Sequence, residues 1–272
     1  MFKGVLKEQA VQVGIGFVFI VVLLGTFILP EWMSNNFMYG LSRGLAVLGL
    51  MILWRTNLVS FGHALFYGFG AYAVAIAQKY LGITDIFLRI IIAIAAAGLL
   101  GFFLGFILRK YREIFFAMLS LAFSMVLYGL LAKAEFLGST DGMSISPSTI
   151  FGIELGRFGL FYFIGFVVIL SLIFAHCYLR SSLGHLTTAI SDNEIRVEYL
   201  GYSVEKAIHI KYVISACLAG GAGGLMAASL GQVDPDSMVL WSVSGELVFV
   251  TIMAGLGNIL APFVGAIFFE FI

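Results

Sequence analysis

Long apolar stretches alternate with short polar ones along most of this chain. Each stretch approaches the roughly 20 residues that an α-helix needs to cross a bilayer. One polar stretch between them is long and also carries positive charges, and it runs from Arg180 to Lys211. The pattern predicts eight membrane-spanning helices, at 11–29, 36–54, 58–78, 87–108, 113–132, 158–179, 207–230 and 244–268.

Composition supports a single all-α, polytopic transmembrane domain over residues 1–272. The chain is 61% hydrophobic and 11% charged, whereas a soluble domain carries roughly 25% charged residues. The net charge is zero, so we expect no nucleic-acid partner. The chain stops at Phe271-Ile272, directly after an apolar run, so we expect a natural C-terminal segment to be missing.

The distribution of Lys and Arg predicts a cytoplasmic N-terminus. The first apolar run follows Lys3 and Lys7 and lacks a small-x-small cleavage site, so it is read as a membrane helix rather than a signal peptide. Segment 180–206 then lies in the cytoplasm. The outer loops carry Asp141, Asp234 and Asp236, for which docking of a binding protein and ordinary solvation are equally good readings.

Glycine and polar residues interrupt several of the predicted spans. Gly101 and Gly105 stand four apart, as do Gly220 and Gly224, a spacing that lets two helices approach closely. The stretches 57–71, 216–231 and 255–265 look less regular. Non-helical backbone in a membrane is tolerated only where it is buried in protein or lines a wet cavity. The candidates for a translocation path are therefore Arg43, Asn57, Ser60, His63, Tyr67 and Asn258.

Two of these candidates have competing interpretations. Arg43 lies within the second predicted span, where a charge is costly and is expected to face the interior or a cavity. It can contact a substrate carboxylate, or it can reach the outer membrane interface. For His63, a structural hydrogen bond is favoured over a role in proton transfer.

The polar segment contains a predicted short helix from Asp192 to Leu200. Ser191 and Glu194 fit a capping box, and Gly201 suits the C-terminus of the helix. Ile195 and Tyr199 would form one apolar stripe, and Val197 and Leu200 another. We expect contacts on two sides, with the membrane domain and with a cytoplasmic protein. The acidic excess argues against a helix that lies on anionic lipid.

Four motifs resemble the permease subunits of branched-chain amino acid ABC importers, in particular the LivM-like type. Segment 60–72 (SFGHALFYGFGAY) is similar to S-L-G-H-A-x-F-x-G-x-G-A-Y. Segment 189–195 (AISDNEI), continued by 198–201 (EYLG), resembles A-I-R-x-[DN]-E-I followed by A-x-x-x-G. Segment 213–220 (VISACLAG) resembles V-I-S-A-x-x-A-G, and 255–266 (GLGNILAPFVGA) resembles G-G-x-G-x-x-x-G-P-x-x-G-A.

The resemblance implies an importer subunit of the bacterial inner membrane. A second related permease, two cytoplasmic ATP-binding subunits and a periplasmic solute-binding protein would be its partners. The sequence has no G-x-x-x-x-G-K-[ST] motif, so ATP is expected to act through a partner. The family has its coupling helix in segment 180–206, and the residues expected to contact the ATPase are Ser191, Asp192, Asn193, Glu194, Ile195, Arg196 and Glu198.

The chain departs from the family pattern near the expected path. Arg55 and Asn57 make the turn before the S-x-G-H segment more polar than usual. Other departures are Trp54, Asn57, Ala254 and Ala261 in place of Gly, and Met51 in place of an Asn. These differences bear on the substrate, which in this family is a branched-chain or other amino acid, urea, a short amide or an aromatic acid.

Two other classes of function remain as alternatives. A stand-alone, ion-coupled secondary transporter needs membrane-embedded acids, and Glu246 is the only acid expected within a span. A membrane-embedded enzyme is disfavoured because the sequence has neither H-E-x-x-H nor clustered metal ligands. We expect no catalytic residues, metal or cofactor in this chain.

Overall fold

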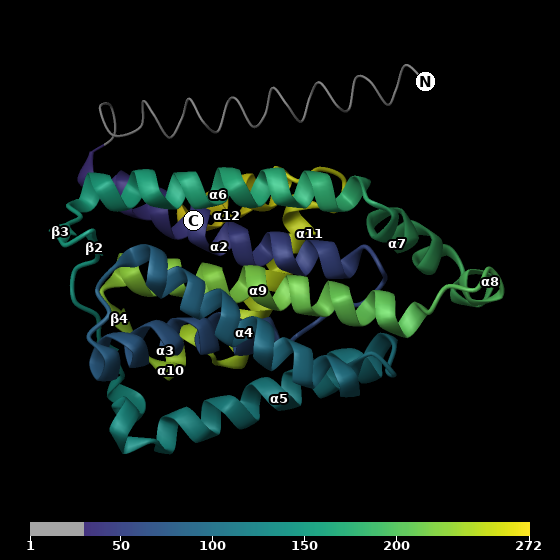
Figure 1. Cartoon of the computed structure of the whole chain (residues 1–272), viewed down its shortest axis with the longest axis horizontal. Helices are drawn as coiled ribbons and strands as arrows, with labels where there is room; N and C mark the ends of the chain where they lie inside the picture. Colours follow the sequence, from purple (N-terminus) through teal and green to yellow (C-terminus); the bar gives the residue numbers. More distant parts are fainter. Residues whose placement is uncertain (1–29) are drawn as a thin grey trace.

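The computed structural model describes residues 30–272, and the predicted first span, 11–29, lies outside them. The described part is a helical bundle (Figure 1). Its helices are α2 (Glu31–Trp54), α3 (His63–Leu81), α4 (Ile86–Leu108), α5 (Glu113–Lys133), α6 (Arg157–Arg180), α7 (Ser182–Asp192), α8 (Glu194–Tyr199), α9 (Val204–Leu230), α10 (Pro235–Met238), α11 (Trp241–Ala254) and α12 (Ala261–Glu270).

The bundle has two distinct ends (Figure 1). One end carries α7 and α8, and we call it the α8 end. The other carries two short antiparallel pairs, β1 (Met143–Ser144) with β4 (Gln232–Val233) and β2 (Thr149–Ile150) with β3 (Ile153–Glu154). We call it the strand end. Between the ends, α6 and α5 lie along opposite edges and α9 packs against α2, α3 and α4 in the middle.

Six helical stretches within residues 30–272 are long and apolar enough to cross a membrane. Five of them match predicted spans to within a few residues, namely α2, α4, α5, α6 and α9. The predicted span at 58–78 is in part wrong, because α3 begins only at His63. The preceding residues are non-helical and mostly buried, as the irregular pattern of this stretch suggested.

The predicted span at 244–268 is wrong. The chain forms two helices here, and α11 ends at Gly255, whose φ of 79° favours glycine. Pro262 lies in the first turn of α12, where its missing N–H costs nothing. Gly40 of α2 faces Ile267 and Gly44 faces Phe263, so α12 runs antiparallel to α2. The apolar run therefore conceals a reversal of the chain.

The glycine spacing predicted from the sequence serves the contact between α4 and α9. A Cβ on Gly101 would stand 2.5 Å from the Cβ of Ala216, and one on Gly220 would stand 2.1 Å from the Cβ of Ala97. Both distances are far below van der Waals contact. The absence of side chains at these positions therefore allows the two helices to pack almost backbone to backbone, as such motifs do in membranes.

We expect Gly223→Ala to destabilise the bundle. The added Cβ would lie 1.8 Å from the carbonyl oxygen of Tyr67, so α3 and α9 would have to separate, at a cost of about 1–3 kcal/mol or more. Gly129→Ala in α5 is the matched control, because nothing lies within 4 Å of its added Cβ. Thermal unfolding of the purified chain in detergent measures the effect. Equal midpoints for the two variants would contradict the packing described here.

Candidate functional site

The two short helices of the α8 end are capped differently from the sequence prediction. Ser191 lies in the last turn of α7, and Asn193 separates α7 from α8. The Asn193 side chain accepts a hydrogen bond from the backbone N–H of Arg196 at 3.0 Å. The predicted capping box is therefore wrong, and the helix predicted from Asp192 to Leu200 is in part wrong, because α8 begins only at Glu194. The predicted helix C-terminus is confirmed, because Gly201 has a φ of 85°.

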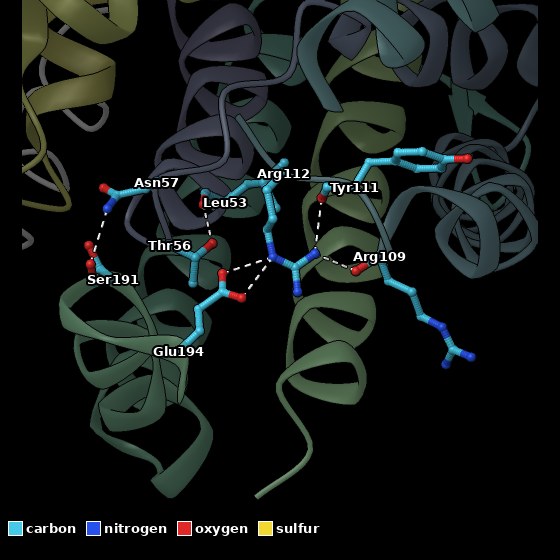
Figure 2. A network of polar contacts seen from close by, with 8 residues as sticks. All are labelled: Leu53, Thr56, Asn57, Arg109, Tyr111, Arg112, Ser191 and Glu194. Carbon is cyan, nitrogen blue, oxygen red and sulfur yellow. Dashed lines mark hydrogen bonds and ion pairs between the residues drawn. The ribbon is translucent and has the colours of Figure 1, made fainter. Parts of the chain in front are cut away.

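Glu194 makes an ion pair with the loop between α4 and α5 instead of capping a helix (Figure 2). The Arg112 Nε lies 2.8 Å and 3.0 Å from the two carboxylate oxygens of Glu194. The guanidinium also donates to the carbonyl oxygens of Arg109 and Tyr111. Because Arg112 is bonded on both sides, it links α8 to the loop that leads into α5.

A second contact joins α7 to the turn that follows α2 (Figure 2). The Asn57 side-chain amide donates to the carbonyl oxygen of Ser191 at 3.2 Å. Asn57 has a φ of 58°, a left-handed conformation that Asn tolerates better than most residues. Thr56 closes the same turn by donating to Leu53 at 2.6 Å. This turn leads directly into the buried, non-helical residues before α3.

The outer face of α8 exposes large apolar side chains. Ile195 is 63%, Tyr199 85% and Leu200 75% exposed, whereas Val197 is buried. The predicted pairing of Val197 with Leu200 on one stripe is therefore wrong. Val197 faces the protein, and the contact of α8 with a cytoplasmic protein stays a prediction. Asp192, Arg196 and Glu198 are also exposed around this face. The face is an apolar centre with a charged rim, which is the composition of a protein interface.

Arg43 lies in the middle of α2, between two carboxylates. Its guanidinium nitrogens stand 3.2 Å from an oxygen of Glu246 on α11 and 3.1 Å from one of Glu270 on α12. Tyr67 is buried within electrostatic reach of all three charges. Arg43 is thus held inside the bundle by two carboxylates. Glu246 is not the only acid in this region, because Glu270 accompanies it.

The other predicted path residues lie in two further places. His63 is fully buried, and its Nε2 lies 2.7 Å from the hydroxyl of Ser215, which donates to the carbonyl of Gly49. Ser60 is buried beside it and accepts from the N–H of Gly62. Asn258 is exposed in the turn between α11 and α12. The structure therefore brings Arg43 together with Tyr67 but separates both from Asn57 and Asn258.

The three aspartates predicted to meet a binding protein all lie at the strand end. Asp234 caps α10 by accepting from the N–H of Ser237 at 2.7 Å. Asp236 accepts from the hydroxyl of Tyr128 at 2.8 Å, and Asp141 is exposed nearby, where β1 pairs with β4. Within residues 30–272, no His, Cys, Asp and Glu side chains gather in a group that could hold a metal ion.

Sequence reasoning missed three residues that shape these sites. Arg112 lies in a short polar loop, and its partner Glu194 is 82 positions away, so no local pattern joins them. Glu270 lies at the end of an apolar run, and nothing in the sequence around it indicates a partner. Arg55 departs from the family pattern, and this departure is the one feature of the sequence that points to a role for it in a site.

The chain matches known transport proteins over most of its length. A family model described as the permease component of a branched-chain amino acid transport system matches residues 32–272. The high-affinity branched-chain amino acid permease protein LivM of Escherichia coli K12 is 31% identical over 250 residues, which cover 81% of this chain and 58% of that protein. LivM of Salmonella typhimurium LT2 is 30% identical over 253 residues, with the same coverage.

A more distant relative extends the pattern. The probable permease LivH of Methanocaldococcus jannaschii is 25% identical over 221 residues, covering 77% of this chain and 67% of that protein. No solved structure matches. The chain spans 58% of the length of each LivM protein. Because the family model matches residues 32–272, this chain belongs to the family of branched-chain amino acid transport system permease components.

Proposed function

We propose that this chain is the transmembrane permease subunit of an ATP-driven ABC importer. It forms half of the path for a small polar solute, a branched-chain amino acid or a related amino acid, amide or organic acid. Family membership supports this function. The observation that carries it is the exposed apolar face of α8, because this face is tied by Arg112 and Asn57 to the loops that enter α5 and α3.

The proposed assembly has the composition that the resemblance implies. A second related permease completes the path, two ATP-binding subunits dock at the α8 end, and a periplasmic solute-binding protein docks at the strand end around Asp141, Asp234 and Asp236. The chain crosses the bacterial inner membrane at least eight times with its N-terminus in the cytoplasm. The turn between α11 and α12 faces the cytoplasm, and α12 is one of the membrane segments.

We expect the triple variant Ile195→Ser, Tyr199→Ser, Leu200→Ser to lose the ATP-binding partner. Removing three exposed apolar side chains from an interface centre lowers its affinity by at least about tenfold. The tagged chain is purified from native membranes, and the P-loop ATPase that accompanies it is identified and quantified. The double variant Phe151→Ser, Ile153→Ser is the control, because these exposed side chains lie at the strand end.

Two outcomes would overturn the proposal. One is an unchanged yield of the ATPase with the triple variant. The other is solute uptake by the pure chain in liposomes without ATP, which would favour the stand-alone ion-coupled transporter. The carboxylates of Glu246 and Glu270 beside Arg43 are the feature that such a transporter would use.

A further inference from the structure

A cavity of about 310 Å³ lies at the α8 end, where four segments meet. The segments are the end of α6, the first turns of α7, the turn after α2 and the turn between α11 and α12. Its lining includes Arg55, Gly184, His185, Thr188, Leu256 and Gly257. Since a water molecule occupies roughly 30 Å³ of liquid, the cavity has room for a small ligand together with several waters.

Arg55 brings a positive charge that no carboxylate balances. Within residues 30–272, Arg43, Arg109, Arg112 and Arg157 each pair with a glutamate, but Arg55 makes no ion pair. Its guanidinium donates one hydrogen bond within the described part of the chain, from Nη2 to the carbonyl oxygen of Leu256 at 2.8 Å. Its Nε is buried and has no partner among the described residues. A partly buried cation without a counter-charge raises the free energy of the folded chain. Binding of a negatively charged ligand would lower it.

The rest of the lining offers further donors. The amides of Leu256 and Gly257 donate no hydrogen bond within the described part of the chain. The His185 ring is exposed at the wall of the cavity. Thr187 and Thr188 already donate to carbonyl oxygens of their own helix. Burial lowers the pKa of Arg55, and no nearby carboxylate opposes that shift. A cationic wall rich in free N–H groups matches an oxyanion.

We propose that this cavity binds an oxyanion, a carboxylate or phosphate group, through the Arg55 guanidinium and the amides of the turn between α11 and α12. The same ligand would touch α7 from the other side. If the proposed function holds, an anion in this cavity fastens the segment that meets the ATPase to the membrane domain. The oxyanion can come from a free cytoplasmic solute or from a lipid headgroup, because both present the same chemistry.

Binding is tested on the full chain in dodecyl maltoside, which carries no phosphate. Thermal unfolding is followed while inorganic phosphate, or dihexanoyl phosphatidylglycerol, is added at constant ionic strength. Phosphate stabilises proteins nonspecifically, so the comparison is between variants. We expect a saturable rise of the unfolding midpoint for the native chain and at least a tenfold weaker apparent affinity for Arg55→Gln. Lys110→Gln, an exposed cation at the same end, is the matched control and should behave like the native chain.

A second variant keeps the test decisive if Arg55→Gln does not fold. Thr188 is exposed at the cavity, so Thr188→Glu should preserve the fold and abolish binding by repulsion. A response to phosphate assigns the site to a free anion, and a response to the lipid alone assigns it to a headgroup. Identical titrations of the native chain and both variants with both probes would overturn the proposal. No step needs the ATPase, so this failure would leave the proposed function untouched.

Discussion

Arg112→Glu is expected to reduce ATP-driven uptake by at least about tenfold while the ATP-binding partner still docks. The substitution places a carboxylate where Arg112 now holds both oxygens of Glu194, at 2.8 Å and 3.0 Å. Two like charges at close range in a partly buried site repel each other. The contact would therefore be formed several-fold to many-fold less often. The exposed face of α8 would survive, but its link to the loop before α5 would be broken.

Charge exchange provides the rescue that identifies this link. Arg112→Glu combined with Glu194→Arg restores opposite charges across the same gap, so we expect part of the uptake to return. The measurement is uptake of a labelled amino acid by cells that produce the complete transporter, with ATPase activity measured in parallel. A drop in uptake with ATPase activity retained indicates lost coupling. Equal loss in the single and double variants would show that the pair does not act as a link.

Mobility of the α8 end gives an independent readout. Without the Arg112 contact, α8 keeps only the packing of its buried Val197, whereas α7 keeps the Asn57 hydrogen bond and its packing against α6 and α9. Limited proteolysis between α6 and α9 should therefore be faster for Arg112→Glu than for the native chain. Glu198→Arg is the matched control, because Glu198 lies on the same short helix but is exposed and makes no ion pair among the described residues. If both variants were cleaved at the native rate, the ion pair would not restrain this segment.

The apolar pattern predicted most of the bundle, because a helix that crosses the hydrocarbon core of a membrane needs about 20 mostly apolar residues, polar side chains being costly there. It failed between Trp241 and Glu270, where both arms of a helical hairpin are apolar and only Gly255 to Leu260 separate them. Hydropathy measures how apolar a stretch is and does not show whether the chain reverses direction within it. The glycine there indicated a break in the helix, but nothing local distinguished a kink from a reversal.

Predictions from local sequence patterns also failed where a side chain pairs with a residue far away in the sequence. The S-x-x-E pattern at Ser191 is a sound capping signal, yet Glu194 pairs with Arg112 and Asn193 takes over as the cap. Arg43 is a similar case. Its place inside a span was visible from the sequence, but its partners lie on α11 and α12, whose arrangement depends on the reversal that the sequence concealed.

The second large effect is expected for Arg43→Gln, which should strongly destabilise the folded chain. It leaves Glu246 and Glu270 facing each other without the cation that separates them. Removing one partner of a buried ion pair costs about 3–5 kcal/mol. We expect the lower end of this range, because the Glu246 side chain is 39% exposed whereas that of Glu270 is 14% exposed. Thermal unfolding in detergent measures the loss as a reduced midpoint.

Neutralising Glu270 tests whether the charge imbalance is the cause. In Arg43→Gln, Glu270→Gln one carboxylate remains, so much of the lost stability should return. Arg157→Gln is the matched control: Arg157 pairs with Glu31 at 2.8 Å, but the side chains are 45% and 82% exposed, and such surface pairs contribute about 0–1 kcal/mol. Native stability of Arg43→Gln would contradict the electrostatic account. Uptake by the stable double variant then decides the remaining question, since unchanged uptake would exclude Arg43 as a contact for a substrate carboxylate.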